Sequence, residues 1–319
     1  MSENPVRQQF ADTMLEVGRD DPNLIVMVGD ISHFILQPFA EACPGRYYNV
    51  GICEPTIISM AAGLSKMGFY PVVHTIAPFI IERGFEQIKL DFCYQQLGGN
   101  LVTVGSVFDY SNLGCTHHCY GDFALLKTLP GAEITYPASP VEFDTLFRQA
   151  YRSGLLTLFR IPAHPHSHGF SPDDIRFGEG IKIADGSNLT IVVTGPQLSN
   201  AVAAWDALGD MGWSADIVYI HTIRPLDTDL IRASVLKTRR VLVVEEHMQS
   251  GGLGDDVLRT TRDIPDVQYS SLSIPDTFVT EYASYEGHCE RLGLSRDGIL
   301  DRVKADFGVG HALQRKGLG

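Results

Sequence analysis

The chain has 319 residues, of which 44% are hydrophobic, and its formal net charge is −13. This length and apolar content suit two globular domains, while the acidic balance argues against a surface for nucleic acids or anionic membranes. The N-terminus, MSENPVRQQF, lacks the basic and apolar regions of a signal peptide, and no run of about eighteen apolar residues occurs. We therefore expect a cytoplasmic protein that does not span a membrane.

Segments in the first half alternate between two types. Continuously apolar, β-branched runs predict buried strands at residues 23–29, 71–76, 101–106, 132–137 and 155–161. Amphipathic stretches predict helices at residues 5–20, 55–66, 82–97, 121–129 and 141–153. This alternation predicts an α/β fold with a mostly parallel sheet that helices cover on both faces.

The rhythm breaks at residues 161–180, which are rich in Pro, Gly, His and Asp. It then resumes, with strands predicted at residues 189–195, 214–220, 240–246 and 267–274, and helices at 199–211, 227–238 and 254–263. We therefore predict two α/β domains, residues 1–170 and 186–319, joined by a linker at 171–185.

Two short motifs carry little chemistry by themselves. The stretch CTHHC, residues 115–119, offers four ligand side chains, but ligands this close in sequence rarely converge on one tetrahedral ion, so we predict no metal site in this chain. The stretch GGLGDD, residues 251–256, has the wrong glycine spacing for a dinucleotide fingerprint and is typical of a tight turn. The six cysteines are scattered along the chain, unlike those of a disulfide scaffold, so we expect them to be reduced thiols.

Glu54 is the one acidic residue between residues 47 and 75, and it stands just before an apolar helical run. Two interpretations are open on the local sequence. The carboxylate could be a helix cap or a first-turn acid that interacts with the helix dipole. Alternatively, it could be a site residue, because an ionised carboxylate among apolar neighbours is costly unless something there needs it.

An ordered series of motifs decides between these interpretations. The series comprises residues 49–55, 61–88, 113–118, 129–142, 221–231, 241–257 and 273–284. In order and spacing it resembles the C-terminal portion of the thiamine-diphosphate enzymes of the transketolase and deoxyxylulose-phosphate synthase family, from about residue 5 to residue 307. The resemblance implies a pyrimidine-binding domain followed by the transketolase C-terminal domain.

The resemblance also implies site residues. Glu54 matches the acid that contacts a ring nitrogen of the cofactor's aminopyrimidine, where it promotes proton transfer from the thiazolium carbon. Phe79 matches an aromatic residue that stacks on the pyrimidine, and Phe85 is a neighbour in the pocket wall. His117 matches a histidine beside the reacting substrate carbon, where it can donate to a developing alkoxide or move a proton.

Basic and imidazole side chains extend this predicted substrate site. Arg7 and Arg160 match family arginines and suit an anionic tail such as phosphate, sulfonate or carboxylate, because a guanidinium is a bidentate fork. His118 is a further substrate-binding candidate; it could line the site mouth or lie on a loop, as could three other histidines, His164, His166 and His168. Leu113 replaces the aspartate that in the family contacts a substrate hydroxyl.

The chain lacks the Gly-Asp-Gly motif and downstream Asn with which the family binds magnesium and the diphosphate. The resemblance therefore implies an N-terminal partner subunit that holds Mg²⁺ and the diphosphate group of thiamine diphosphate. It further implies a self-dimerising chain within a heterotetramer.

Together these features predict the C-terminal subunit of a two-component transketolase-like transferase of carbohydrate metabolism. It would move a two-carbon ketol unit from a ketose, with an anionic tail, to an aldose acceptor. One alternative is the beta subunit of a 2-oxo-acid dehydrogenase decarboxylase component, which the loss of the aspartate at Leu113 keeps open. Another is a noncatalytic assembly subunit that has kept the fold.

Overall fold

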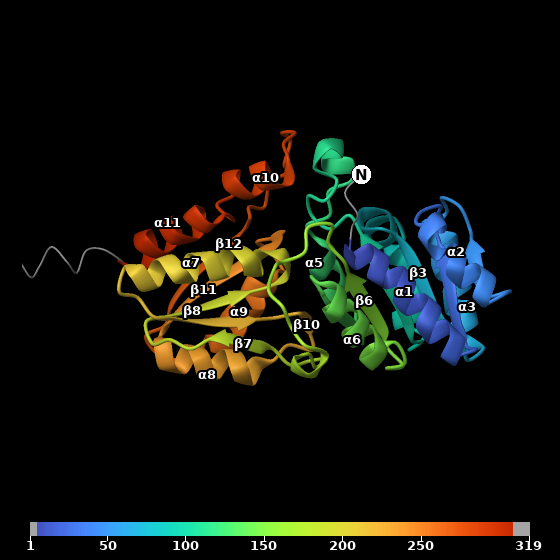
Figure 1. Cartoon of the computed structure of the whole chain (residues 1–319), viewed down its shortest axis with the longest axis horizontal. Helices are drawn as coiled ribbons and strands as arrows, with labels where there is room; N and C mark the ends of the chain where they lie inside the picture. The colour runs from blue at the N-terminus through green and yellow to red at the C-terminus, as the bar shows by residue number, and fades with distance from the viewer. Residues whose placement is uncertain (1–4, 309–319) are drawn as a thin grey trace, which may run out of the picture.

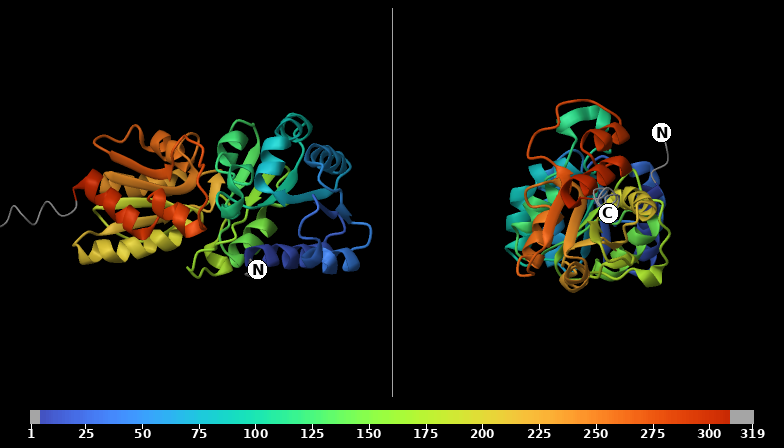
Figure 2. Two further views of the ribbon diagram at one scale, coloured as in Figure 1. Left: turned by 90° about the horizontal axis from the view of Figure 1, so that it is seen from above. Right: turned by 90° about the vertical axis from the view of Figure 1, so that its left-hand side faces the viewer.

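A computed structural model describes residues 5–308 of the chain. Two α/β halves lie side by side along the long axis of the molecule, the N-terminal half in blue to green and the C-terminal half in yellow to red (Figure 1). Figure 2 shows the same two bodies from above and from one end.

The first sheet has seven strands in the order β10-β5-β6-β4-β3-β1-β2. Their bounds are β1 Leu24–Val28, β2 Tyr47–Asn49, β3 Tyr70–Ile76, β4 Gly99–Val104, β5 Ala132–Thr135, β6 Leu156–Arg160 and β10 Thr222–Arg224. All neighbours are parallel except β10, which runs antiparallel to β5. The register aligns Met27, Val73, Leu101, Leu158 and Ile134 across five strands, and all five belong to one buried cluster.

Helices cover both faces of this sheet. On one face lie α1 Pro5–Asp20, α2 His33–Ala42 and α6 Pro140–Ala150, whose aromatic side chains Phe10, Phe39 and Phe143 are fully buried. On the other face lie α3 Glu54–Lys66, α4 Phe85–Gln87, α5 Asp122–Lys127 and the π-helical segments η1 Phe79–Arg83 and η2 Ile88–Cys93. A 3₁₀ segment, η3 Ser111–Thr116, follows β4.

The second sheet has five strands in the order β12-β11-β8-β9-β7, and β7 alone is antiparallel to its neighbour. The strands are β7 Ile181–Ala184, β8 Leu189–Val193, β9 Ala215–Tyr219, β11 Arg240–Met248 and β12 Gln268–Ile274. The helices are α7 Leu198–Asp210, α8 Thr228–Thr238, α9 Leu253–Thr261, α10 Tyr285–Arg291 and α11 Arg296–Phe307, with 3₁₀ turns η4 Pro172–Asp174 and η5 Gly195–Gln197.

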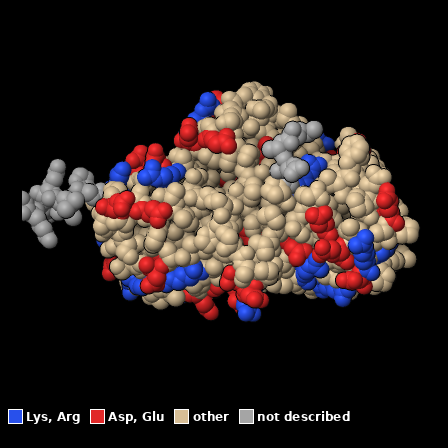
Figure 3. All heavy atoms as spheres, viewed as in Figure 1, with Lys and Arg blue, Asp and Glu red and all other residues tan. Residues whose placement is uncertain are grey.

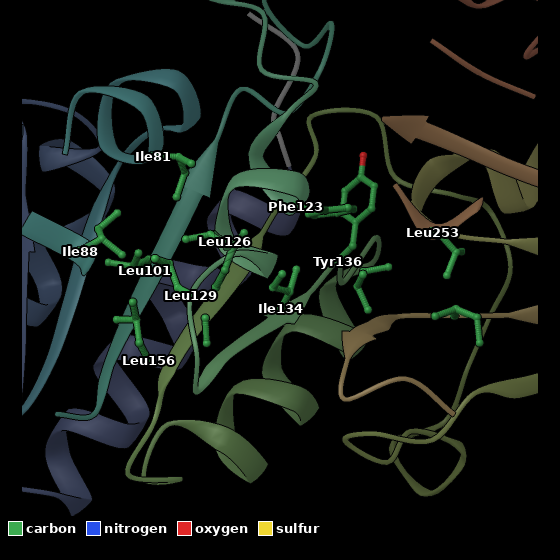
Figure 4. Packing of buried hydrophobic residues seen from close by; sticks show 14 of the residues in the cluster. Ile81, Ile88, Leu101, Phe123, Leu126, Leu129, Ile134, Tyr136, Leu156 and Leu253 are labelled. Carbon is green, nitrogen blue, oxygen red and sulfur yellow. The ribbon is translucent and has the colours of Figure 1, made fainter. Parts of the chain in front are cut away.

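The two halves share a continuous core. Strand β10 leaves the second half and pairs with β5 of the first, Thr222 with Thr135 and Arg224 with Ile134. One hydrophobic cluster runs from the first sheet through Ile134 and Tyr136 to residues of the second half such as Leu253 (Figure 4). The halves are therefore bonded through a strand and a core, and not merely tethered by a linker.

The fold class predicted from the sequence is confirmed, because both sheets are mostly parallel and flanked by helices. The chain departs from the predicted elements in several places. The helix expected at residues 82–97 is a series of π and α turns that begins at Phe79; Gly84 packs tightly there, since a Cβ on it would lie 2.6 Å from the Ile80 carbonyl oxygen. Short elements α2, β2 and β10 were not predicted, and β7 lies within the range 171–185 expected as linker.

Charges are mixed on the face seen in Figure 3, where Lys and Arg side chains lie beside Asp and Glu over α1 and α6. One such group joins Arg148 of α6 to Glu16 of α1 and to Asp144. Within residues 5–308, no helix combines the length and the apolar character needed to cross a membrane.

Candidate active site

The carboxyl edge of the first sheet brings together most of the predicted site residues. Glu54 follows β2, Phe79 follows β3 and His117 follows β4, and these strands lie close together in the sheet. Loops after parallel strands meet at one edge, which is where α/β proteins usually bind ligands.

Glu54 is the first residue of α3, with Cys53 at the N-cap. Its side chain is only 4% exposed. The one hydrogen bond to its carboxylate from within residues 5–308 comes from the guanidinium of Arg83, whose Nη1 is 3.4 Å from Oε1. Glu54 is thus a first-turn acid, as one interpretation predicts, but the bond it makes is to a side chain and not to a backbone amide of α3.

Arg83 also contacts Phe79. Both belong to the π-helical turn η1, and the guanidinium carbon lies 4.1 Å from the centroid of the Phe79 ring. This is a cation–π contact, and the Phe79 ring keeps part of its surface exposed. π-Helical turns are rare and occur frequently at functional sites.

His117 follows η3 and completes the group. Its ring centroid lies 5.1 Å from that of Phe79, edge-on at 69°, and 6.0 Å from that of Tyr110. Its Nδ1 is 2.9 Å from the Thr116 hydroxyl. Glu54, Arg83, Phe79 and His117 therefore form a connected set, which we call the Glu54 cluster.

The second half braces the segment that carries His117. Gly114 of η3 has φ 72°, and a Cβ there would lie 2.9 Å from the ring of Tyr282. The backbone amide of Val279 donates to the hydroxyl oxygen of Tyr120 at 3.4 Å. The position of His117 therefore depends on both halves of the chain.

Arg7 lies at the same edge through a relay of polar groups. Its Nε donates to the Ser32 hydroxyl at 2.8 Å, and that hydroxyl lies 2.6 Å from Nε2 of His74. Nδ1 of His74 lies 2.8 Å from the Val102 carbonyl oxygen, which assigns the proton to Nδ1. Burial lowers the pKa of His74 to about 3. Burial raises the pKa of Tyr110 and the charge of Arg7 opposes that rise, so Arg7 lies within electrostatic reach of Tyr110, whose ring is near that of His117.

Arg160 is not part of the cluster. Its side chain is fully buried, with Nε 3.2 Å from the carboxylate of Asp122 and the guanidinium 4.5 Å from the ring centroids of both Phe123 and Tyr136. Two backbone carbonyls accept from its Nη2. An arginine so enclosed has no surface to offer a substrate anion, so this geometry disfavours the predicted substrate role and suits a core ion pair.

Phe85 and His118 contact residues outside the Glu54 cluster. Phe85 is partly buried and packs against the core cluster beneath α3 and η2. His118 is 3% exposed, and its ring lies 5.3 Å from Phe108 and 5.6 Å from His288 of α10. Burial lowers the pKa of His118. The side chain of His118 thus lies between the two halves, next to the cluster in sequence but not at its surface.

The three histidines at residues 164–168 have separate environments. His166 is buried, and its Nε2 lies 2.7 Å from Oε2 of Glu142, whose other carboxylate oxygen, Oε1, accepts from the hydroxyl of Tyr219 at 2.7 Å. His164 stacks on the ring of Tyr285 in α10, and His168 packs against the ring of Phe170. His166 is therefore a structural link between the halves.

Sequence reasoning missed four residues of this edge: Arg83, Ser32, His74 and Tyr110. Arg83 is four residues after Phe79, a spacing that puts side chains on one face of a helix, so the motif itself held a signal. Ser32 and His74 were not identifiable, because their contact with Arg7 joins three distant segments.

The Glu54 cluster fits an aminopyrimidine ring. A buried carboxylate with a single long hydrogen bond can accept from a ring nitrogen, and a partly exposed phenyl ring can stack on a planar heterocycle. For metal ions the finding is different. Over residues 5–308, no group of three or more His, Cys, Asp or Glu side chains is arranged to hold an ion.

Comparison with known proteins gives two family matches in the chain. Residues 3–163 match the transketolase pyrimidine-binding domain, and residues 178–299 match the transketolase C-terminal domain.

Three individual proteins show how far the likeness extends. One of the subunits of the apulose-4-phosphate transketolase of Phocaeicola vulgatus is 31% identical over 296 residues, which is 92% of this chain and 94% of that protein. The 1-deoxy-D-xylulose-5-phosphate synthase of Syntrophus aciditrophicus is 28% identical over 98% of this chain, which spans only 49% of that protein. A solved structure described as a split gene transketolase, an inactive beta4 tetramer, superposes with a TM-score of 0.84 at 27% identity, over 95% of this chain and 98% of that one.

Proposed function

Because the chain belongs to the transketolase family of transferases, we propose that it is the pyrimidine-binding subunit of a two-component transketolase. The reaction would transfer a two-carbon ketol unit from a ketose donor to an aldose acceptor. The observation that carries this proposal is the Glu54 cluster, in which a buried carboxylate, a stacking ring and a histidine converge at one sheet edge.

Glu54 is proposed to hydrogen-bond a ring nitrogen of the aminopyrimidine. When bound, thiamine diphosphate supplies a carbon nucleophile and an electron sink for cleaving the bond next to a ketose carbonyl. The low exposure of Glu54 excludes competing water, so one proton can be held at its carboxylate oxygen.

Phe79 and His117 are proposed to act on either side of this acid. The Phe79 ring would orient the pyrimidine by stacking. His117, edge-on to that ring, would donate to the oxygen of the substrate carbonyl as negative charge develops on it. Phe85 is proposed to keep Phe79 in place through the core beneath η1.

Arg7 is proposed to bind the anionic tail of the substrate. Its Nε is held by Ser32, which leaves it oriented at the same edge as Tyr110 and His117. The relative from Phocaeicola vulgatus is named for a sugar phosphate, which supports an anionic substrate. His118 and Arg160, which are buried, are proposed to support the site from within the core rather than to touch substrate.

A partner subunit is proposed to cover the cluster. Apolar side chains are exposed along α3, with Ile52 just before the helix at 69%, Met60 within it at 45% and Met67 at its C-terminal end at 76%, as expected for a surface that another chain buries. Two relatives, one named as a transketolase subunit and one described as a split gene transketolase, support this assembly. We propose that the partner holds Mg²⁺ and the diphosphate in a cytoplasmic heterotetramer, and that this chain divides into domains 1–170 and 186–319.

The test is reconstitution of the chain with the product of an adjacent reading frame that carries the diphosphate motif. The pair, with thiamine diphosphate and Mg²⁺, should transfer two carbons from a ketose phosphate or sulfonate to an aldose. Turnover of a 2-oxo acid with an electron acceptor would instead identify a decarboxylase component. Failure of the pair to bind thiamine diphosphate would identify a noncatalytic subunit.

A further inference from the structure

The guanidinium of Arg83 lies where two contacts of the Glu54 cluster meet. It is 3.4 Å from the Glu54 carboxylate and 4.1 Å from the centre of the Phe79 ring. These are the two residues to which the proposed function assigns the cofactor ring, one by hydrogen bond and one by stacking.

A guanidinium resembles an aminopyrimidine in the properties that allow a group to bind both Glu54 and Phe79. Both groups are planar and delocalised, both can make hydrogen bonds with a carboxylate at their edge, and both stack on an aromatic face. The Arg83 side chain therefore satisfies Glu54 and Phe79 with the same chemistry that the cofactor ring would use.

The two contacts of Arg83 are weak enough for a ligand to displace the side chain. Its side chain is 52% exposed, so water can solvate the charge as soon as it leaves. The bond to Glu54 is long, at 3.4 Å, and half-exposed ion pairs and cation–π contacts contribute little each. A rotation about the arginine side chain would free both contacts without movement of η1.

We propose that Arg83 is a displaceable occupant of the pyrimidine site, which pairs with Glu54 and covers Phe79 until the cofactor ring takes both contacts. This rests on the proposed function. It makes Arg83 a positioning residue that keeps the buried carboxylate paired. The apparent cofactor affinity is then lower, in proportion to the fraction of molecules in which Arg83 has left the site.

The test measures the affinity of thiamine diphosphate, with Mg²⁺, for the reconstituted complex by calorimetry or fluorescence quenching. Arg83→Met removes the charge and the planar fork while it keeps the length of the side chain. It should bind the cofactor about 3- to 10-fold more tightly than the wild type, because the competing occupant is gone. Arg83→Lys, which keeps the charge but not the fork, should lie between the two.

Arg152 offers a matched control. Its side chain is also 52% exposed, it also pairs with a carboxylate that is 4% exposed, that of Asp21, and it also lies over aromatic rings, those of Tyr70 and Tyr151. Arg152→Met should leave cofactor affinity unchanged, which excludes a general effect of net charge. In a Glu54→Gln background, Arg83→Met should tighten binding less than it does in the wild type.

The outcomes separate the two proposals. If the wild-type complex binds no thiamine diphosphate, the proposed function fails. If the wild type binds but Arg83→Met and Arg83→Lys, both folded by circular dichroism, bind equally or more weakly, then Arg83 supports the cofactor or is indifferent to it. Either result overturns the displacement proposal and leaves the proposed function in place.

Discussion

Two arginine–carboxylate pairs stand at opposite edges of the first sheet. Asp21 and Arg152 lie where β1 and β6 begin, and Glu54 and Arg83 lie at the carboxyl edge. In both pairs the arginine side chain is 52% exposed and the carboxylate 4%. Burial alone therefore does not tell the two pairs apart.

The hydrogen bonds to the two carboxylates distinguish the pairs. Asp21 accepts from the Asn23 amide at 2.9 Å, from the Tyr151 hydroxyl at 3.2 Å and from Arg152 at 2.5 Å. Burial opposes its ionisation, but these partners together lower the pKa of Asp21 below its ordinary value of 3.8. Glu54 has one long bond, to Arg83, from the described part of the chain. A saturated carboxylate is a structural element, and one left nearly unused is available to a ligand.

Replacing the acid at the carboxyl edge should give the largest effect. Glu54→Gln keeps the shape but cannot hold the proton, so turnover of the reconstituted enzyme should fall about 100-fold or more. The unfolding midpoint of the isolated chain, measured by circular dichroism, should stay close to the wild type. Full turnover by the variant would remove the functional distinction between the two edges.

The same substitution at the amino edge should act on stability. Asp21→Asn loses the charge of a carboxylate that accepts hydrogen bonds from Asn23, Tyr151 and Arg152. The loss is moderate because water already screens the half-exposed arginine. We expect the free energy of unfolding to fall by about 1–2 kcal/mol. Urea denaturation measures this loss, and steady-state assays should show turnover within about twofold of wild type. A large loss of turnover with unchanged stability would reverse our assignment of the edges.

The aromatic partners of the two arginines allow a third comparison. Phe79→Ala should weaken thiamine diphosphate binding by about 2- to 13-fold, since a stacking contact contributes about 0.5–1.5 kcal/mol. Tyr70→Ala, which removes a ring beneath Arg152, should leave the affinity unchanged. Titration of the cofactor into each reconstituted variant tests the pair; equal losses would mean that Phe79 acts only through the general packing of the sheet.

The smallest effect concerns pH. The pKa of Asp21 is lower in the folded chain than in the unfolded one, so its contribution to stability is present above about pH 4 and is lost as the pH falls through the folded value. The stability gap between wild type and Asp21→Asn should therefore shrink as the pH falls from about 5 to about 2. Denaturation curves at several pH values measure it, and a gap that is constant with pH would contradict the ionic origin of the effect.

The sequence was sufficient for the parts of the molecule that depend on local pattern. Buried strands show as continuous apolar runs, so β1, β3, β4 and β6 were predictable. Short elements were not: β10 has three residues, and α2 contains Pro38. The family motifs identified Glu54, Phe79 and His117, and the structure brings all three together.

Contacts between distant segments were beyond the sequence. Arg160 occupies a strand end that suits a substrate ligand, yet Asp122 and Phe123 of α5 and the ring of Tyr136 enclose it. Arg83 meets Glu54 only because η1 turns as a π-helix beside the start of α3. Such placements follow from tertiary packing, which no local pattern encodes.

Strand β10 sets where a protein of this architecture can be divided. A cut within residues 171–185 would take β10 away from β5 and leave the backbone groups of Ile134 and Thr135 unpaired, on an edge open to aggregation. The apolar cluster through Tyr136 would be exposed by the same cut. The two halves should therefore be inherited, expressed and engineered as one unit. A chimera that exchanges one half should take β10 and its partner strand β5 from the same protein.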